Sequence, residues 1–161
     1  MLSNFTRYVF LIYFVTHIPT TLLIDMQAIF SEFYPESLKN LLQWHIETNG
    51  DFLMATLPLW FRSVIWGEYV MQLPFFFVAS YAFYKGANWI RIPTIIYGSH
   101  VATTMIPILS EILYSPEMTA GSTARIQLFC IYLPYLVVPL ALVLTMSFNE
   151  YPFGKKSGKD D

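Results

Sequence analysis

Four long stretches of the chain are mostly apolar. They lie at about residues 8–30, 63–84, 92–114 and 126–148, and each reaches the roughly 20 residues that a helix needs to cross a bilayer. The pattern predicts an all-α integral membrane protein with four transmembrane helices in one bundle. Because the stretches take up more than half of the 161 residues, we expect a single membrane domain over 1–161, with a short tail at 149–161.

The long connection between the first two stretches, residues 31–60, contains a helix signal of its own. Pro35 and Glu36 begin this helix, and Asn49-Gly50 ends it. One face of it carries Leu38, Leu41, Leu42 and His45. Together with Trp44, such a face suits a cap that lies on the membrane surface or over the mouth of a cavity. A helix that only packs against its neighbours fits the same pattern.

The composition supports a membrane location and argues against several other classes of protein. Hydrophobic residues make up 55% of the chain and charged residues 12%, whereas soluble domains carry about a quarter of charged residues. The net charge of −2 and the scattered basic residues argue against a nucleic-acid partner. The single cysteine, Cys130, builds neither a disulfide framework nor a zinc site, and no phosphate-binding loop is present. We therefore expect no metal and no cofactor.

The distribution of Lys and Arg predicts the orientation in the membrane. One side of the predicted spans holds six basic residues, Arg7, Lys85, Arg91, Lys155, Lys156 and Lys159, and the other side holds three, Lys39, Arg62 and Arg125. Since basic residues favour the cytoplasmic side, both termini are predicted to be cytoplasmic. The sequon Asn4-Phe5-Thr6 then escapes glycosylation, and a glycosylated Asn4 would contradict this orientation.

Two acidic residues lie inside the predicted spans. Asp25 falls in the first span and Glu68 in the second, where an acid near the helix centre costs roughly 2.5 to 3.5 kcal/mol. No Lys or Arg lies inside any of the four spans. One hypothesis is that the two carboxyl groups meet, share a proton and keep about one negative charge for a ligand. The alternative is that each acid reaches water or a backbone donor near the membrane surface and has no further role.

Other polar residues recur along single helix faces. In the third span they follow three- and four-residue steps, and similar pairs lie in the second and fourth spans: Tyr97, His100, Thr104, Ile108 and Glu111; Glu68 and Gln72; Tyr132 and Tyr135. Such stripes predict an interior that is not purely hydrocarbon. The alternative is hydrogen bonding between helices, worth only about 0.6 kcal/mol each.

Prolines are predicted to bend the spans. The spans contain Pro19, Pro74, Pro107, Pro134 and Pro139, and each proline removes a backbone hydrogen bond and bends its helix. Bent helices favour a cavity between them.

The histidines show no zinc-ligand spacing, and we expect His17 and His100 to be hydrogen-bonded core residues.

Short pieces spread over residues 13–139 resemble the EXPERA family, which includes the emopamil-binding sterol isomerases. The matching pieces are His17-Ile18-Pro19, Asp25-Met26-Gln27-Ala28, Asn40-Leu41-Leu42 with Trp44, Glu68 with Gln72-Leu73-Pro74-Phe75-Phe76, Trp89-Ile90-Arg91, Tyr97, His100, Thr103-Thr104 with Ile106-Pro107-Ile108-Leu109-Ser110, and Tyr132 with Pro134-Tyr135. Interrupted identity over so much of the chain is specific, and it is closest to a receptor branch of the family.

The resemblance implies a four-helix protein of the endoplasmic-reticulum membrane, with nuclear and endolysosomal membranes as further locations. It implies a homodimer with a lateral pocket in each copy. The implied ligands are cholesterol, hydroxylated cholesterol and cationic amphiphilic small molecules. The implied partner is the Niemann-Pick type C cholesterol transporter.

The resemblance also implies the residues of the pocket. Asp25 matches the acid that meets the ligand amine, and Glu68 matches the acid that supports it. The other matching pocket positions are Gln72, Tyr97, Thr104, Tyr132, Tyr135, Leu41 and Trp44. The chain departs from the family pattern at His45, where Tyr is expected, and at Val64, where Phe is expected. Its tail ends in Lys159-Asp160-Asp161 instead of a lysine run, which departs from a lysine-based retrieval signal.

Two functions are compatible with these residues. The first is a receptor that binds sterols and amines without catalysis and influences lipid traffic. The second is a sterol isomerase, in which one carboxyl group protonates a ring double bond and another group removes a neighbouring proton. The site that holds an ammonium would also stabilise the intermediate carbocation. The resemblance to the receptor branch favours the first function.

Overall fold

The computed structural model describes residues 1–118 and 121–155, and within these residues every regular element is helical. The longer helices are α1 (Asn4–Thr20), α3 (Glu36–Asn49), α5 (Leu59–Gly67), α6 (Leu73–Lys85), α7 (Arg91–Tyr114), α8 (Gly121–Tyr132) and α9 (Pro134–Ser147). The shorter elements are η1 (Thr21–Asp25), α2 (Gln27–Phe30), η2 (Ser31–Phe33), α4 (Phe52–Thr56), η3 (Glu68–Gln72) and η4 (Asn88–Ile90).

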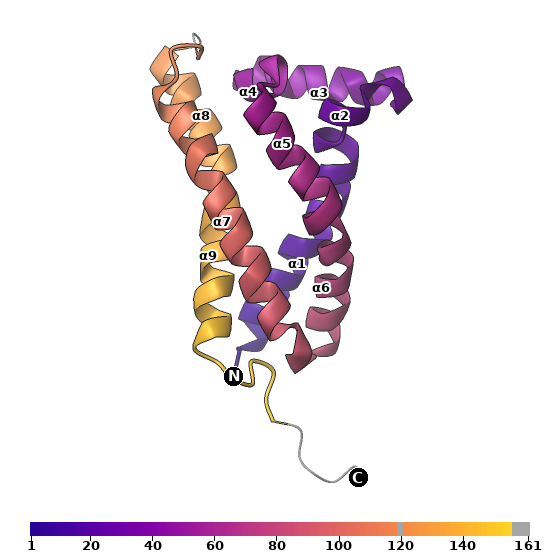
Figure 1. Cartoon of the computed structure of the whole chain (residues 1–161), viewed down its shortest axis with the longest axis vertical. Helices are drawn as coiled ribbons and strands as arrows, with labels where there is room; N and C mark the ends of the chain where they lie inside the picture. Colours follow the sequence, from indigo (N-terminus) through magenta and orange to yellow (C-terminus); the bar gives the residue numbers. More distant parts are fainter. Residues whose placement is uncertain (119–120, 156–161) are drawn as a thin grey trace.

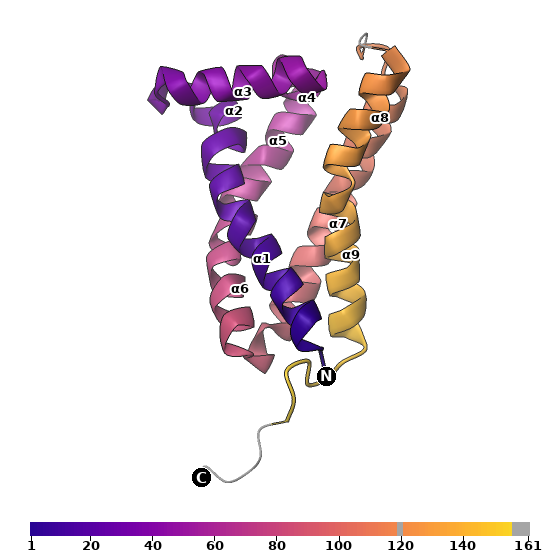
Figure 2. The ribbon, with the colours of Figure 1, turned by 180° about the vertical axis from the view of Figure 1, so that it is seen from behind.

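The elements form four long helical segments with a cap across one end (Figure 1). Helix α7 packs along α9, and α1 packs along α6. These two pairs converge at the end that holds the N-terminus and separate toward the other end, where α3 lies across the bundle (Figures 1 and 2). The N-terminus, the turn after α6 and the end of α9 share one end of the bundle, as the predicted topology requires.

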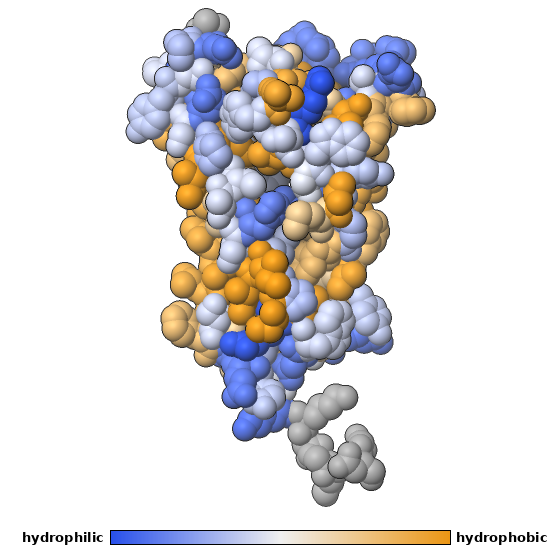
Figure 3. Space-filling view, viewed as in Figure 1, coloured by the Kyte–Doolittle hydropathy of each residue, from blue (hydrophilic) through white to orange (hydrophobic). Residues whose placement is uncertain are grey.

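Three of the four segments are long and apolar enough to cross a membrane: Asn4–Phe33, Asn88–Tyr114 and Gly121–Ser147. The fourth, residues 59–85, runs beside them but is less apolar, since it carries Glu68 and Gln72 among its residues. Figure 3 shows hydrophobic residues over the middle of the molecule and hydrophilic residues at both ends. The helical elements and the three long apolar segments confirm the prediction of an all-α membrane protein.

The helix predicted in the long connection is confirmed as α3. It begins at Glu36 and ends at Asn49, and Gly50 follows in the left-handed conformation with φ of 63°. A residue with a side chain is strained at that φ, so glycine suits this helix end. Helix α3 lies across the ends of α2 and α5, at the end of the molecule where the two helix pairs separate (Figure 1).

At the end where the two helix pairs converge, an arginine side chain joins the two helices of each pair. Arg7 of α1 donates from Nε to the carbonyl oxygen of Phe83 in α6 at 2.6 Å. Arg91 of α7 donates from Nε to the carbonyl oxygen of Met146 in α9 at 2.8 Å. The last carbonyls of a helix lack backbone partners and carry the negative end of its dipole, so a cation stabilises them. Arg7 and Arg91 therefore close helix ends.

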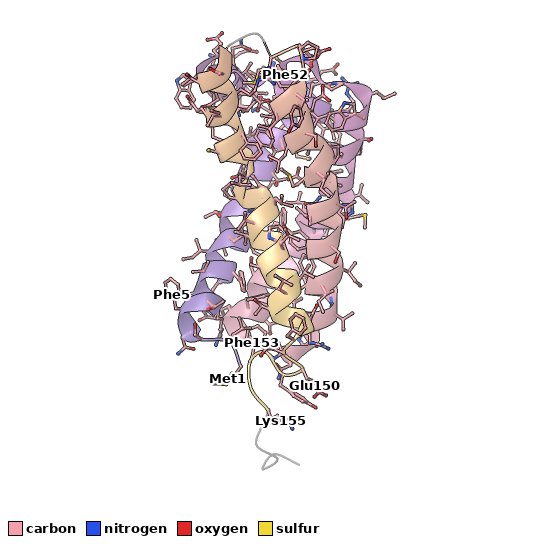
Figure 4. The ribbon with its side chains drawn as sticks, turned by 90° about the vertical axis from the view of Figure 1, so that its left-hand side faces the viewer. Met1, Phe5, Phe52, Glu150, Phe153 and Lys155 are labelled. Atoms are coloured by element: carbon pink, nitrogen blue, oxygen red, sulfur yellow. The ribbon has the colours of Figure 1, made fainter. Side chains whose placement is uncertain are left out.

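The beginning of the tail packs on the same end of the bundle, where Met1, Glu150 and Phe153 are labelled in Figure 4. The Leu2 N–H donates to the carbonyl oxygen of Pro152 at 2.7 Å, and the ring of Phe153 lies edge-on to Phe83 at 5.3 Å. The rest of the tail, residues 156–161 with Lys156 and the terminal Lys159-Asp160-Asp161, lies outside the described residues.

Gly98 of α7 lies against α9, and its replacement tests this packing. A Cβ atom at Gly98 would lie 2.7 Å from Cγ2 of Val143 and 2.8 Å from the carbonyl oxygen of Pro139. We expect Gly98→Ala to destabilise the protein by about 1 to 3 kcal/mol, because the backbone of α9 must move. Thermal unfolding in detergent measures the effect. The control is Gly67→Ala, whose Cβ would lie 3.9 Å from Nε2 of His100. Equal unfolding temperatures for the two variants would contradict the packing.

Candidate ligand-binding site

A cavity of 320 Å³ lies between the four helical segments and reaches the cap. Its volume falls at the lower end of the range of small-molecule sites, about 300 to 1,000 Å³. Apolar side chains from α5, α7 and α8 make up much of the wall, including Phe61, Ile65 and Met105. The polar and titratable residues of the wall are Tyr13, His17, Thr20, Asp25, His45, Glu68, Gln72, Tyr97, Thr104, Tyr132 and Tyr135.

Both acids of the spans line this cavity, and each lies in a π-helical turn beside a proline. In η1 the Met26 N–H donates to the Thr21 carbonyl oxygen at 2.9 Å, and in η3 the Leu73 N–H donates to that of Glu68. Both bonds span five residues instead of four. Such turns widen a helix locally and are frequent at functional sites. Pro19 and Pro74 each lie two residues from one of these turns. The sequence analysis predicted bends at the prolines but did not predict the π-helical turns.

The two carboxyl groups have different partners. Glu68 Oε1 accepts a hydrogen bond from Oγ1 of Thr21 at 2.6 Å. In the described part of the chain no hydrogen bond reaches the carboxyl group of Asp25, which lines the cavity and lies close enough to Glu68 for their charges to interact. The structure thus brings the two acids together without a hydrogen bond between them. Among the described residues, Asp25 thus has both carboxyl oxygens free of protein hydrogen bonds, whereas Thr21 occupies one oxygen of Glu68.

The charge of the cavity is one-sided. Among the described residues of its wall there are two carboxyl groups and neither Lys nor Arg. The negative charge of Asp25 and Glu68 is therefore not balanced by a Lys or Arg side chain in this wall. An ionised acid in a low-dielectric site is costly without an opposite charge. A cationic ligand with an apolar body supplies what the cavity lacks.

Tyr34 fixes the turn that carries Asp25. Its hydroxyl donates to the carbonyl oxygen of Leu22 at 2.5 Å, across the π-helical turn. Burial, and to a lesser degree the charge of Asp25, raises the pKa of the Tyr34 hydroxyl. The hydroxyl is therefore a neutral donor at physiological pH and keeps this bond.

Five further residues that the resemblance implied also line the cavity: Gln72, Tyr97, Thr104, Tyr132 and Tyr135. The Tyr97 hydroxyl is hydrogen-bonded to that of Tyr13 at 3.1 Å, and the ring of Phe75 stacks on Tyr97 at 4.9 Å. Thr104 Oγ1 donates to the carbonyl oxygen of Val101 at 2.9 Å. These bonds fix the wall around the acids.

The structure does not bring Leu41 and Trp44 to the cavity. Leu41 is 42% exposed and Trp44 is 60% exposed, and both lie on α3 away from the cavity wall. The residue of α3 that lines the cavity is His45. Leu41 lies one turn before His45 on the same face of α3, so the two residues differ in their position along the helix, which lies across one end of the molecule (Figure 2). Glu111 and His100 of the predicted stripe are also absent from the wall, whereas Ile108 is part of it.

Asp51 is a functional candidate that the sequence analysis missed. It is 0% exposed, and its Oδ2 accepts from the Tyr132 hydroxyl at 2.7 Å and contacts Nε2 of His45 at 3.1 Å. Its Oδ1 accepts from the Met54 N–H at 3.1 Å and so caps α4. Asp51 therefore joins the cap to α8 beside the cavity. A signal was present, because an Asp directly before an apolar run is typical of a helix N-cap.

The two core histidines differ from each other. His17 is hydrogen-bonded through Nδ1 to the carbonyl oxygen of Tyr13 at 2.9 Å, as predicted. The prediction is wrong for His100, whose Nε2 is buried with no hydrogen-bond partner in the described part of the structure. Within the residues described, no three His, Cys, Asp or Glu side chains form a group that could hold a metal ion.

Comparison with known proteins places these residues in a family. The sequence model of the family described as EXPERA (EXPanded EBP superfamily) matches residues 37–146. Sigma intracellular receptor 2 of Xenopus tropicalis is 47% identical over 155 residues, which cover 91% of this chain and 91% of that protein. Sigma intracellular receptor 2 of Homo sapiens is 42% identical over 151 residues, 87% of this chain and 86% of that protein.

A more distant relative is the efficient mitochondria targeting-associated protein 19 of Saccharomyces cerevisiae. It is 27% identical over 152 residues, which cover 83% of this chain and 92% of that protein. The resemblance that the sequence pieces indicated is thus confirmed over most of the chain.

Proposed function

The chain belongs to the EXPERA family, and from this premise we propose that it is a receptor for sterols and cationic amphiphiles that acts in cholesterol homeostasis and trafficking. The observation that carries the proposal is the one-sided charge of the cavity. Asp25 and Glu68 face an apolar space, and the described wall offers neither Lys nor Arg. The receptor names of the relatives support binding without catalysis.

In the proposed complex, Asp25 receives the ligand amine or, in a sterol, the ring hydroxyl. Glu68 supports Asp25 from the neighbouring helix, and Thr21 holds Glu68 in place at 2.6 Å. Gln72, Tyr97, Thr104, Tyr132 and Tyr135 surround the apolar body of the ligand. An apolar cavity with a few fixed polar groups binds such molecules by burial and orients them by hydrogen bonds.

We propose the endoplasmic-reticulum membrane as the location, with both termini in the cytoplasm. The shared position of the N-terminus and the turn after α6 supports this orientation, because Arg7 and Lys85 then lie on one side (Figure 1). We further propose a homodimer and, as a partner, the Niemann-Pick type C cholesterol transporter, both from the family resemblance.

A sterol isomerase is the second candidate function. It is favoured by the presence of two carboxyl groups in one apolar cavity, since isomerisation needs a proton donor and a group that removes a proton. The two functions differ in turnover. Conversion of a sterol to its double-bond isomer by the purified protein would favour the enzyme, and binding without conversion would favour the receptor.

The direct test of the receptor compares a cationic amphiphile with a neutral amide of the same shape. We expect the amine to bind the purified protein at least tenfold more tightly, because only the amine supplies a charge for Asp25. Equilibrium binding with a radiolabelled amine measures both affinities by displacement. Equal affinities would show that the acids do not hold the ligand.

A further inference from the structure

In the part of the chain that the structure describes, two side-chain hydrogen bonds tie α3 and the turn after it to α8. Asn49 Oδ1 accepts from Nε2 of Gln127 at 3.0 Å. Asp51 Oδ2 accepts from the Tyr132 hydroxyl at 2.7 Å. The ring of His45 contacts both Asn49 and Asp51. We propose that His45 is a pH-sensitive latch, whose neutral ring holds the tie between Asn49 and Gln127 and whose protonation releases it.

The two ties lie at the end of the molecule where the helix pairs separate (Figures 1 and 2). His45 of α3 and Tyr132 of α8 both line the cavity. Because the tied elements both contribute to its wall, a tie between them restrains the movement that lets a ligand in or out. Loss of one tie therefore speeds ligand exchange. This effect on ligands rests on the proposed function, whereas the latch itself does not.

The backbone fixes which ring nitrogen of His45 carries the proton. One atom of the Asn49 amide lies 3.0 Å from the carbonyl oxygen of His45 and 3.1 Å from Nδ1 of the ring. A carbonyl oxygen only accepts, so this amide atom is the donating nitrogen. Nδ1 therefore accepts and carries no proton. The proton of the neutral ring is on Nε2, which donates to Asp51 Oδ2 at 3.1 Å.

A protonated His45 does not fit this arrangement. An imidazolium carries a proton on both nitrogens, so Nδ1–H would face the NH₂ group of Asn49, donor against donor. If the amide turned its oxygen toward Nδ1, that oxygen would lie against the carbonyl oxygen of His45. The Asn49 side chain must therefore leave its place. Its bond with Gln127 is lost with it.

The second tie survives protonation. The carboxylate of Asp51, which is 0% exposed, forms an ion pair with the imidazolium where it now accepts from the neutral ring. Asp51 still accepts from the Tyr132 hydroxyl. The cap therefore stays attached to α8 at one point, and the latch loosens it without detaching it.

Histidine is the side chain of this cluster suited to a switch near physiological pH, because its charge changes between about pH 5 and 8. The other titratable groups around the ring are Asp51, the cavity residues Asp25, Glu68 and His17, and the tyrosines Tyr13, Tyr97, Tyr132 and Tyr135. On α3 itself, Lys39 pairs with Glu36, and Glu47 accepts from Gln43. A test must therefore separate His45 from His17 and from the acids.

Nitrogen NMR of protein labelled at its histidines tests the latch without any ligand. At about pH 7.5 we expect the His45 ring to carry its proton on Nε2, and at about pH 5.5 to carry protons on both nitrogens. The variant His45→Tyr assigns the signal by removing it. A proton on Nδ1 at the higher pH, or a neutral ring at the lower pH, would overturn the proposal.

The effect on the cap is measured as the dissociation rate of a radiolabelled neutral amide amphiphile, whose charge does not change with pH. For wild-type protein we expect about fivefold faster dissociation at about pH 5.5 than at about pH 7.5, the worth of one hydrogen bond. His45→Tyr should show equal rates, since it does not titrate in this range and its backbone carbonyl still holds Asn49. Gln127→Ala should dissociate fast at both pH values. Gln43→Ala is the matched control and should behave as wild type.

Three results would contradict the latch. One is a wild-type rate that does not change with pH. Another is an equal acceleration in His45→Tyr, which would assign the pH effect to His17 or to the acids. The third is slow dissociation from Gln127→Ala at both pH values, which would show that the tie does not restrain the cap. If wild-type protein bound no amphiphile at either pH, the receptor function would fail, and the NMR result would still decide on the latch.

Discussion

Asp25→Asn should lower the affinity for a cationic amphiphile by about a hundredfold or more while the protein still inserts and folds. At about 4 Å and an effective dielectric constant near 20, an ion pair is worth roughly 4 kcal/mol before desolvation. Each 1.4 kcal/mol corresponds to about a factor of ten in affinity. Desolvation cancels part of the ion-pair energy, and the part that remains accounts for the expected loss of affinity. Equilibrium binding of a radiolabelled amine to purified protein measures it.

Two variants serve as controls for this loss. Glu68→Gln should weaken binding less than Asp25→Asn, because Glu68 Oε1 is engaged by Thr21 and acts on the ligand through Asp25. Glu111→Gln should leave binding unchanged, since Glu111 is outside the cavity wall. Near-wild-type affinity in well-folded Asp25→Asn would show that the amine binds elsewhere.

Asp51→Ala should destabilise the protein and weaken binding of every ligand, charged or neutral. The change removes the acceptor of the Tyr132 hydroxyl, the contact with His45 and the cap of α4 at Met54. Three lost partners at about 1 kcal/mol each amount to roughly 3 kcal/mol. For a chain of this length that corresponds to about 6 to 12 °C in the unfolding temperature. Thermal unfolding in detergent, with and without ligand, measures it.

Tyr132→Phe is the matched control, because it removes one of these hydrogen bonds and keeps the ring. We expect it to lose about a third of the stability lost in Asp51→Ala. An unchanged unfolding temperature in Asp51→Ala would contradict the role of Asp51 in joining the cap to α8. A loss of affinity confined to cationic ligands would instead make Asp51 a partner of the amine.

The helical segments and their polar faces could be predicted from the sequence. The bilayer sets the length of an apolar stretch, and the α-helix sets the three- and four-residue spacing of side chains on one face. Asp25 and Glu68 were recognisable because acids are rare within apolar stretches. That the two acids share a site was one of two hypotheses that the sequence left open. Their placement in π-helical turns was not predictable. A turn closed over five residues instead of four leaves the pattern of side chains almost unchanged.

The cap was harder to predict than the spans. Asp51 stands in a connection with several other acids, and its burial depends on Tyr132, which is 81 residues away in the chain. Leu41 and His45 share a helix face in the sequence, but their exposure depends on how α3 lies across the bundle. Only His45 lines the cavity. Contacts over such separations follow from tertiary packing and not from local pattern.

The central claim is that one cavity takes either a sterol or a cationic amphiphile. Competition between cholesterol and a radiolabelled amine on the purified protein tests it most directly. The account predicts that added cholesterol raises the apparent Kd of the amine and leaves its maximum binding unchanged, because both ligands occupy the space beside Asp25. Amine binding that stays constant as cholesterol saturates the protein would show separate sites and contradict the account.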